Sequence, residues 1–149
     1  MGDDIDLYRR ILKQMPEAVI FADRNGIVRL WNEGAGTVFG FSRQEIEGTN
    51  LDVLIPEALR ARHWEAYRRA MTTGILQLGN RVLPTRGIHK SGRTIYIDLS
   101  FALVRDDGEA VLGAAAVGRD ITEKYQSEKA QRMRLAELEK AIREKSGAA

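Results

Sequence analysis

The segment AVIFADRNGIVRLWN, residues 18–32, contains two apolar, β-prone runs on either side of a polar turn. The runs cover 18–22 and 27–31, and Asp23-Arg24-Asn25-Gly26 lies between them. The Asn-Gly pair supplies the positive φ that a tight turn between antiparallel strands requires. The sequence therefore predicts a β-hairpin at the start of the domain.

Short helices follow this hairpin. The pattern predicts three of them, over residues 32–39, 42–48 and 50–54. Ser42 with Glu45 three residues later has the spacing of a capping box, which indicates a helix start. Pro56 favours the first turn of a longer helix, which we expect to run to about Thr73 and to end at Gly74.

The last third of the domain is rich in strands. A strand is predicted over 78–88, where the internal Pro84 indicates a bulge or a sheet edge. Residues 93–104 alternate, which places four apolar side chains on one face: Ile95, Ile97, Leu99 and Phe101. A further strand of small residues covers 110–117. We therefore predict an α+β fold, with a five-stranded antiparallel sheet and short helices on one face.

Helices are predicted on both sides of this core. Residues 4–13 form a short amphipathic lead helix that ends before Pro16. The chain after Ile121 is polar and charged, and predicts a long helix with a thin apolar stripe interrupted by Glu128 and Gln131. Such a helix is marginal alone, and we expect it to pair with a partner helix. The predicted organisation is a lead helix over 1–15, a core domain over 16–121 and a C-terminal helix over 122–149.

Composition excludes several functions. The 149 residues carry 44% hydrophobic and 30% charged residues and a net charge of +2, which does not indicate a nucleic-acid binder. The chain has no cysteine, which excludes disulfides, thiolate metal sites and a cysteine-linked chromophore. No apolar run is long enough to span a membrane, so a cytoplasmic location is expected. No nucleophile elbow, phosphate loop or metal-ligand cluster indicates an enzyme.

The chain contains two histidines, which differ in setting. His89 lies in the turn before Lys90-Ser91-Gly92, where an exposed position is expected. His63 shares a helix face with apolar residues at three- and four-residue steps: Leu59, Ala66, Tyr67 and Ala70. Two interpretations follow. His63 is a core histidine bonded to a backbone carbonyl, or it is a neutral imidazole available to a haem iron.

Several segments, in this order, resemble the PAS family. They are Ala18–Asp23, Leu30-Trp31-Asn32, Phe39-Gly40-Phe41-Ser42, Lys90-Ser91-Gly92 and Gly118-Arg119-Asp120-Ile121-Thr122-Glu123. The resemblance covers roughly residues 8–125. It implies a sensory domain whose last strand continues, through the Asp-Ile-Thr junction, into an output helix.

The helix from Ile55 to His63, followed by Tyr67, is similar to the corresponding helix of haem-binding PAS oxygen sensors. This resemblance implies b-type haem with His63 as the axial iron ligand, lined by a cofactor-binding set: Tyr67, Arg69, Arg81, Leu99 and Phe101. Arg69 would pair with a propionate, Arg81 would donate to bound oxygen, and Leu99 and Phe101 would form the distal wall.

Two departures from those sensors stand out. The stretch from His63 to Arg81 is about two residues shorter, and Gln77 occupies the position of a second propionate partner. The function implied is the sensing of oxygen or another diatomic gas, relayed to the C-terminal helix. A homodimer through the flanking helices and a separate output protein are the expected partners. The alternative is a cofactor-free PAS module that acts in dimerisation or binds a small organic ligand.

Overall fold

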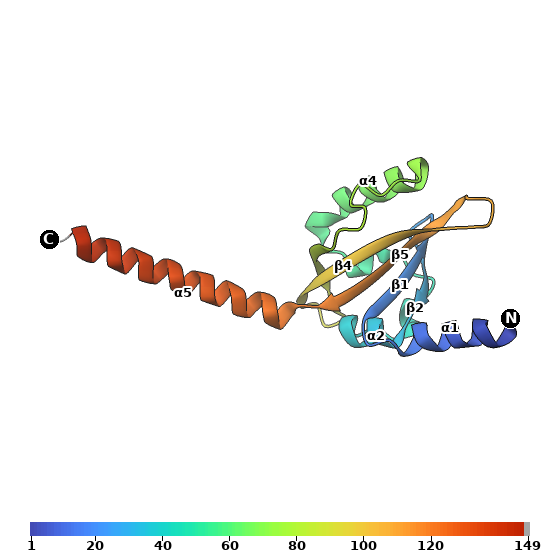
Figure 1. The fold of residues 1–149 in the computed structure, drawn as a ribbon, viewed down its shortest axis with the longest axis horizontal. Helices are drawn as coiled ribbons and strands as arrows, with labels where there is room; N and C mark the ends of the chain where they lie inside the picture. Colours follow the sequence, from blue (N-terminus) through green and yellow to red (C-terminus); the bar gives the residue numbers. More distant parts are fainter. Residues whose placement is uncertain (148–149) are drawn as a thin grey trace.

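In a computed structural model, which describes residues 1–147, five strands form one antiparallel sheet (Figure 1). Their order across the sheet is β2-β1-β5-β4-β3. The strands are β1 (Ala18–Asp23), β2 (Val28–Trp31), β3 (Leu83–Ile88), β4 (Thr94–Arg105) and β5 (Val111–Asp120). The α+β class, the antiparallel sheet and the number of strands are therefore confirmed.

Short helices and one longer helix connect the β2 and β3 edges of the sheet. They are α2 (Glu33–Phe39), α3 (Arg43–Ile46), the 3-10 helix η1 (Leu51–Leu54) and α4 (Glu57–Thr73). The predicted capping box is present, with the Ser42 hydroxyl and the Glu45 carboxylate each accepting from the other's backbone N–H. Gly74 ends α4 in the left-handed conformation, with φ of 70°.

The core lies between the sheet and these helices. Ile95 and Ile97 of β4 are fully buried against Phe39, Ile46 and Leu54 of the short helices, because alternation along the strand turns every second side chain inward. The prediction that these alternate residues of β4 share one face, directed at the core, is thus confirmed for Ile95 and Ile97. Further along the same face, Leu99 and Phe101 are only half-buried.

The third strand differs from its prediction. Its start was predicted at Leu78, but β3 begins at Leu83, and residues 77–80 form a turn instead. Gly79 adopts a φ of 57°, and the Arg81 N–H donates to the carbonyl oxygen of Leu78. The apolar residues before Leu83 suggested a strand, but the left-handed glycine breaks the extended backbone. Pro84 was predicted to mark either a bulge or a sheet edge, and β3 is indeed an edge strand.

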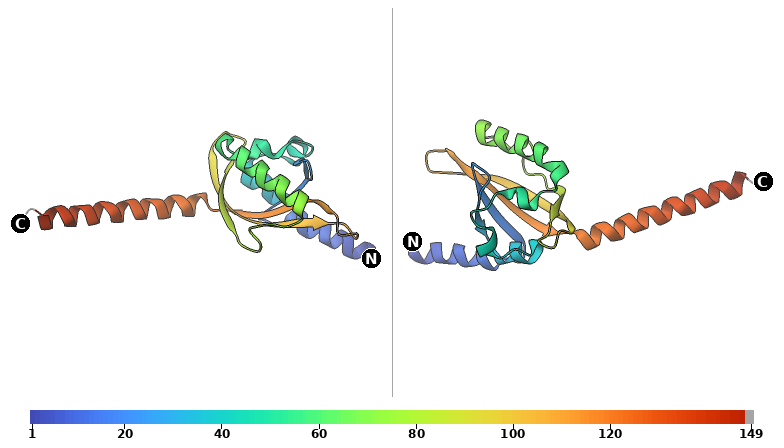
Figure 2. Two further views of the ribbon diagram at one scale, coloured as in Figure 1. Left: turned by 90° about the horizontal axis from the view of Figure 1, so that it is seen from above. Right: turned by 180° about the vertical axis from the view of Figure 1, so that it is seen from behind.

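Flanking helices extend from the core at opposite ends of the long axis (Figures 1 and 2). They are α1 (Gly2–Gln14) and α5 (Thr122–Gly147), and neither buries a residue. The last two residues of the predicted signalling helix, 148 and 149, lie outside the described residues. No helix within residues 1–147 has the length and apolar character of a membrane span.

A buried asparagine joins α1 to the core. The Asn32 carbonyl oxygen accepts from the N–H groups of Val19 and Ala35, which caps α2. Its amide nitrogen lies 2.9 Å from the carbonyl oxygen of Leu12 and 3.3 Å from that of Met15, and also donates to Glu17. Asn32 therefore fixes the end of α1 against the first strand.

Candidate functional site

Helix α4 carries His63, the residue predicted to ligate the haem iron. Its fully buried residues are Ala70 and Met71 in the last two turns, while His63 and Tyr67 are half-buried, one turn apart on the same face. The two rings lie 5.7 Å apart between centroids, and the Trp64 ring meets His63 edge-on at 4.7 Å. The predicted inward position of His63 is consistent with this arrangement.

The imidazole of His63 has an unusual polar environment. Its Nδ1 atom is buried and has no hydrogen-bond partner within residues 1–147. Burial lowers the pKa of His63 below its ordinary value, and the charge of Asp52 opposes this shift only partly. His63 is therefore held as a neutral imidazole, the form that coordinates metals.

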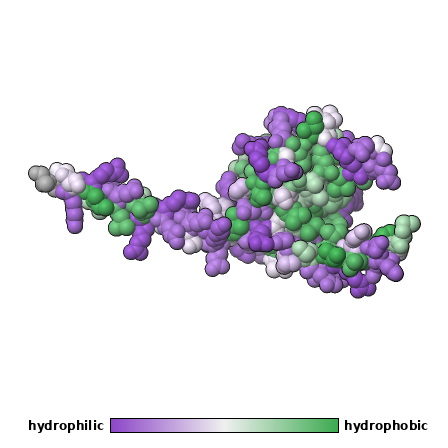
Figure 3. Space-filling model, in the orientation of Figure 1, coloured by the Kyte–Doolittle hydropathy of each residue, from purple (hydrophilic) through white to green (hydrophobic). Residues whose placement is uncertain are grey.

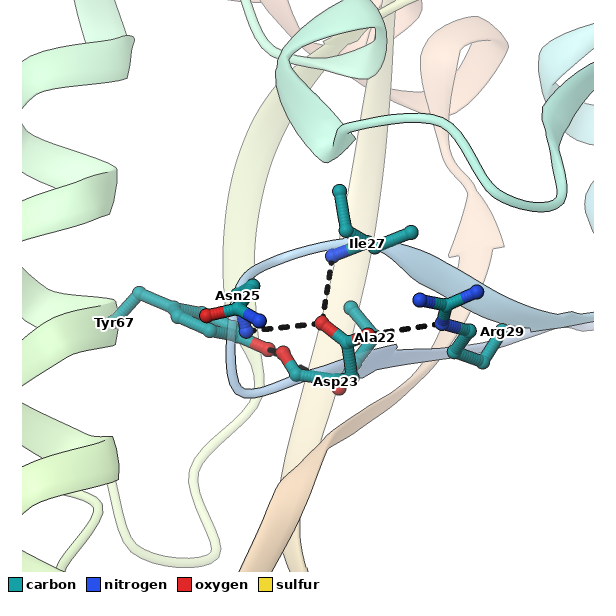
Figure 4. Close-up of polar contacts among 6 residues, drawn as sticks. All are labelled: Ala22, Asp23, Asn25, Ile27, Arg29 and Tyr67. Carbon is teal, nitrogen blue, oxygen red and sulfur yellow. Dashed lines mark hydrogen bonds and ion pairs between the residues drawn. The ribbon is translucent and has the colours of Figure 1, made fainter.

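Trp64 and Tyr67 attach α4 to the β1–β2 turn. Trp64 donates through Nε1 to Asp52 in η1, and its ring covers Gly26 so closely that a Cβ there would lie 2.1 Å from the ring. The Tyr67 hydroxyl lies within hydrogen-bond distance of the carbonyl oxygens of Ala22 and Asp23 (Figure 4). Burial, with the nearby Asp23 charge, raises the pKa of Tyr67 to about 12.

The turn beneath Tyr67 is itself held by a carboxylate. Asp23 accepts from the backbone N–H groups of Asn25 and Ile27 at 2.9 and 3.1 Å, and from Arg29 Nε at 2.9 Å (Figure 4). Partial burial raises the pKa of Asp23, but these hydrogen bonds and the Arg29 charge outweigh that effect and lower it. The Asp23 contacts therefore fix the turn to which Trp64 and Tyr67 of α4 are attached.

The sheet supplies an apolar wall from β4. Leu99 and Phe101 point to the same face as the buried Ile95 and Ile97, and they pair with Gly118 and Ala116 of β5. Gly118 has no side chain where Leu99 crosses it, and a Cβ there would lie 2.3 Å from Leu99 Cδ2. Small residues in β5 therefore leave room for the larger side chains of β4.

The two candidate arginines lie outside this cluster. Arg69 is exposed and forms an ion pair with Glu65 at 3.0 Å on the outer side of α4. Arg81 lies in the turn before β3, not on the sheet as predicted, and its guanidinium donates to the carbonyl oxygens of Leu78 and Gln77. The structure thus brings Tyr67 beside His63, and leaves Arg69 and Arg81 on the surface.

Sequence reasoning missed the residues that anchor α4. Arg24 donates to the carbonyl oxygens of Met71 and Val111, and Arg105 donates to those of Gly74 and Glu109. These arginines hold the C-terminal end of α4 to the β1–β2 turn and the β4–β5 hairpin. No local pattern indicates these contacts, since the partners lie up to 87 residues apart.

A metal site made only of side chains is not found in the described chain. Residues 1–147 contain no cluster of three or more histidine, aspartate or glutamate side chains that could hold an ion. A single histidine such as His63 can hold a metal only where a cofactor supplies the other ligands.

Comparison with known proteins gives consistent matches. The family model for the PAS domain matches residues 16–123. "Sensor protein FixL" of Bradyrhizobium diazoefficiens is 33% identical over 137 residues, which is 90% of this chain and 25% of that protein. "Oxygen sensor protein DosP" of Escherichia coli is 28% identical over 98 residues, 66% of this chain and 12% of that protein. The chain thus spans a quarter or less of these relatives.

Solved structures show the same fold. A PAS domain from Colwellia psychrerythraea superposes with a TM-score of 0.71 at 21% identity, covering 81% of this chain and 99% of that one. An RNA-binding light-oxygen-voltage receptor superposes with a TM-score of 0.70 at 19% identity, covering 91% and 37%. The predicted family and its resemblance to the oxygen-sensor branch are confirmed by the domain match and the two sensor relatives. The chain belongs to the PAS domain family.

Proposed function

We propose that this PAS sensory domain binds b-type haem through Nε2 of His63, senses oxygen or another diatomic gas, and relays the bound state to α5. One observation carries the proposal: His63 is half-buried, and its Nδ1 atom is buried without a hydrogen-bond partner in the described chain. In the other interpretation, a core histidine, a backbone carbonyl would accept a hydrogen bond from Nδ1. The described chain gives Nδ1 no such partner.

The residues around His63 suit a flat apolar cofactor. Leu99 and Phe101 would face the haem ring from the sheet, and Tyr67 would border the haem beside His63. Iron supplies the position at which a diatomic gas binds. Arg69 would turn from Glu65 to a propionate, and Arg81 would leave the carbonyls of the 77–80 turn to reach the gas. Both arginines are bound by weak, exposed contacts that cost little to exchange.

The sheet connects the apolar face of β4, which carries Leu99, to the start of the output helix α5. Leu99 lies against Gly118 of β5, two residues before Asp120, which caps the start of α5 through Thr122. Any displacement of Leu99 would press on β5 near this junction. The function assigned is therefore sensing and relay, not catalysis, in a cytoplasmic protein with a separate output partner or output domain.

Haem titration of the purified protein tests this proposal. We expect a Soret band distinct from that of free haem, lost in His63→Ala and retained in His89→Ala. His89 is a matched control, since it is the other histidine and lies in the turn after β3. A band that survives His63→Ala, or no band in the unmodified chain, would contradict the proposal.

A second candidate is a cofactor-free module that acts in dimerisation or binds a small organic ligand. It is favoured by the exposed apolar faces of α1 and α5 and by the half-buried Leu99 and Phe101. Light scattering and native mass spectrometry test this second candidate. A strict monomer with no bound small molecule would exclude this candidate, and a homodimer through the flanking helices fits both.

A further inference from the structure

Trp64 of α4 is held between two segments from other parts of the chain. Its indole N–H donates to the Asp52 carboxylate in η1. The six-membered ring of the same indole lies on Gly26 in the β1–β2 turn, where a Cβ atom would come within 2.1 Å of Cη2 and 2.4 Å of Cζ3. A charge-assisted hydrogen bond thus fixes one end of the indole, and close packing fixes the other. Gly26 and Asp52 together form a socket for the Trp64 ring.

The two sides of this socket are bonded to each other. The Gly26 carbonyl oxygen accepts from the N–H of Leu51, the residue before Asp52, at 3.0 Å. Ile27 forms a β-bridge with Asn50, and the Asn50 side chain accepts from the Asp52 N–H at 2.9 Å. These contacts join the β1–β2 turn to η1, so the socket keeps its width when α4 is displaced.

The half of α4 that carries His63 has few other attachments to the core. The buried residues of α4, Ala70 and Met71, lie nearer its C-terminal end. In the space-filling view, hydrophobic residues remain at the surface over the sheet between α4 and α1, so α4 does not cover this part of the sheet (Figure 3). The position of the His63 turn therefore depends on the contacts that Trp64 and Tyr67 make with the β1–β2 turn and η1.

The imidazole of His63 is oriented by packing and not by a hydrogen bond. A histidine that ligates a metal usually donates its second ring nitrogen to a carboxylate or a carbonyl, which fixes the plane of the ring. Nδ1 of His63 has no such partner within residues 1–147. The Trp64 ring instead lies 4.7 Å from the imidazole at an angle of 78°, closer than the Tyr67 ring at 5.7 Å. The nearest aromatic neighbour of the imidazole is thus the ring held in the socket.

We propose that Trp64 is a positioning residue for His63: the socket of Gly26 and Asp52 holds the indole, and the indole holds the imidazole in the plane from which it ligates the haem iron. Asp52 acts through Trp64, without touching the ligand. The inference deepens the proposed haem function and rests on it, whereas the dependence of the imidazole on the socket can be measured without haem.

Magnetic resonance of the haem-free full chain tests this dependence. The ring current of Trp64 shifts the carbon-bound proton resonances of the His63 ring away from those of a free histidine. Gly26→Ala should return them toward the free values, because the added Cβ displaces the indole. Gly48→Ala is the matched control: both glycines have positive φ, of 76° and 85°, but a Cβ at Gly48 would meet no atom within 4 Å. Unchanged His63 resonances in Gly26→Ala, or an equal change in Gly48→Ala, would overturn the proposal.

Variants of Asp52 test the other side of the socket and remain informative if Gly26→Ala does not fold. Asp52→Ala removes the acceptor, whereas Asp52→Asn keeps an oxygen that can accept from the indole N–H. We expect Asp52→Ala to change the His63 resonances and to speed hydrogen exchange of the Trp64 indole, and Asp52→Asn to preserve both. The indole of Trp31, which donates to the Phe41 carbonyl oxygen, is the internal reference. Identical His63 resonances in the two variants would overturn the role of Asp52.

Haem titration tests whether the orientation of His63 affects ligation. Loss of a group that orients a metal ligand typically lowers metal affinity by 10–100-fold, so we expect Gly26→Ala and Asp52→Ala each to weaken haem binding about tenfold. The same substitutions should have little effect in a His63→Gly background supplied with free imidazole, because an untethered imidazole orients itself. Equal losses in the two backgrounds would assign the effect to the shape of the cavity and would overturn the proposal.

These experiments separate the positioning role from the haem proposal. Haem binding through His63 that is equally tight in the unmodified chain, Gly26→Ala and Asp52→Ala would refute the positioning role alone. No haem binding by the unmodified chain, with His63 resonances that still depend on Gly26 and Asp52, would refute the haem function while the socket still orients His63.

Discussion

Tyr96 and Tyr125 stack face to face, with ring centroids 3.8 Å apart and planes inclined by 16°. The backbone of Tyr96 also receives the Ile121 N–H at its carbonyl oxygen and donates to the Thr122 hydroxyl at 3.0 Å. One residue near the start of β4 thus holds both the start of α5 and its first turn. The orientation in which α5 leaves the core depends on this residue.

Loss of the stacked ring should loosen α5 without unfolding the sheet. We expect Tyr125→Ala to raise amide hydrogen exchange in the first two turns of α5, because an aromatic pair contributes about 0.5–1.5 kcal/mol beyond its buried area. The melting temperature of the core should change little. Tyr125→Phe keeps the ring and is the control, and equal exchange in both variants would refute a role for stacking.

The buried histidine predicts a pH dependence of stability in the haem-free protein. Burial lowers the pKa of His63 below 6.5, so protons bind the unfolded chain more readily than the folded one. The contribution of His63 to stability is therefore complete above pH 6.5 and is lost as the pH falls below it. Urea denaturation at several pH values should show this loss in the unmodified chain and in His89→Ala. His63→Leu should remove it, and an unchanged slope there would assign the effect elsewhere.

Asn32 performs two tasks that substitution can separate. Asn32→Ala removes the α2 cap and leaves buried carbonyl and N–H groups unpaired, so we expect a loss of about 3 kcal/mol in the free energy of unfolding. Asn32→Asp keeps the capping oxygen but loses the donors to Leu12, Met15 and Glu17. It should therefore release α1, seen as faster hydrogen exchange in residues 8–14. Protection of α1 equal to that of the unmodified chain would contradict the proposed tie.

Gly118 should tolerate no side chain beneath Leu99. A Cβ at Gly118 would lie 2.3 Å from Leu99 Cδ2 and 3.0 Å from the carbonyl oxygen of Asp98. We expect Gly118→Ala to destabilise the fold by about 1–3 kcal/mol, as overpacking does. In a double-mutant cycle, Leu99→Ala should recover part of this cost, because it removes the closer contact. Strict additivity would show that the two residues are not coupled. Gly2→Ala, at an open position, is the neutral control.

The sequence predicted those features that depend on nearby residues. The hairpin around Gly26, the Ser42 capping box and the alternation in β4 each follow from residues within a few positions. The strand predicted from Leu78 was wrong, because apolar residues there indicated β-structure while the left-handed Gly79 made a turn. Within the candidate site, helical spacing placed His63 and Tyr67 on one face of α4.

Contacts between distant residues were beyond such reasoning. The Arg24 contact with Val111 and the ion pair of Arg119 with Glu17 join segments far apart in the chain. Their side chains carry no local pattern that names a partner. The prediction that Arg81 lies on the sheet failed for a local reason, because the turn before Arg81 depends on the left-handed conformation of Gly79, and a glycine is also compatible with a strand.

The register Ala18 opposite Gly118 has a wider consequence. Paired residues on neighbouring strands lie only about 5 Å apart, so the chain enters and leaves the sensory core at nearly one point. Ion pairing of Glu17 with Arg119 closes this junction. A domain of this kind can be inserted into a helical rod, or removed from it, while the separation of the two rod segments hardly changes. The position of the sensory core along such a rod is therefore set by the two flanking helices and not by the size of the core.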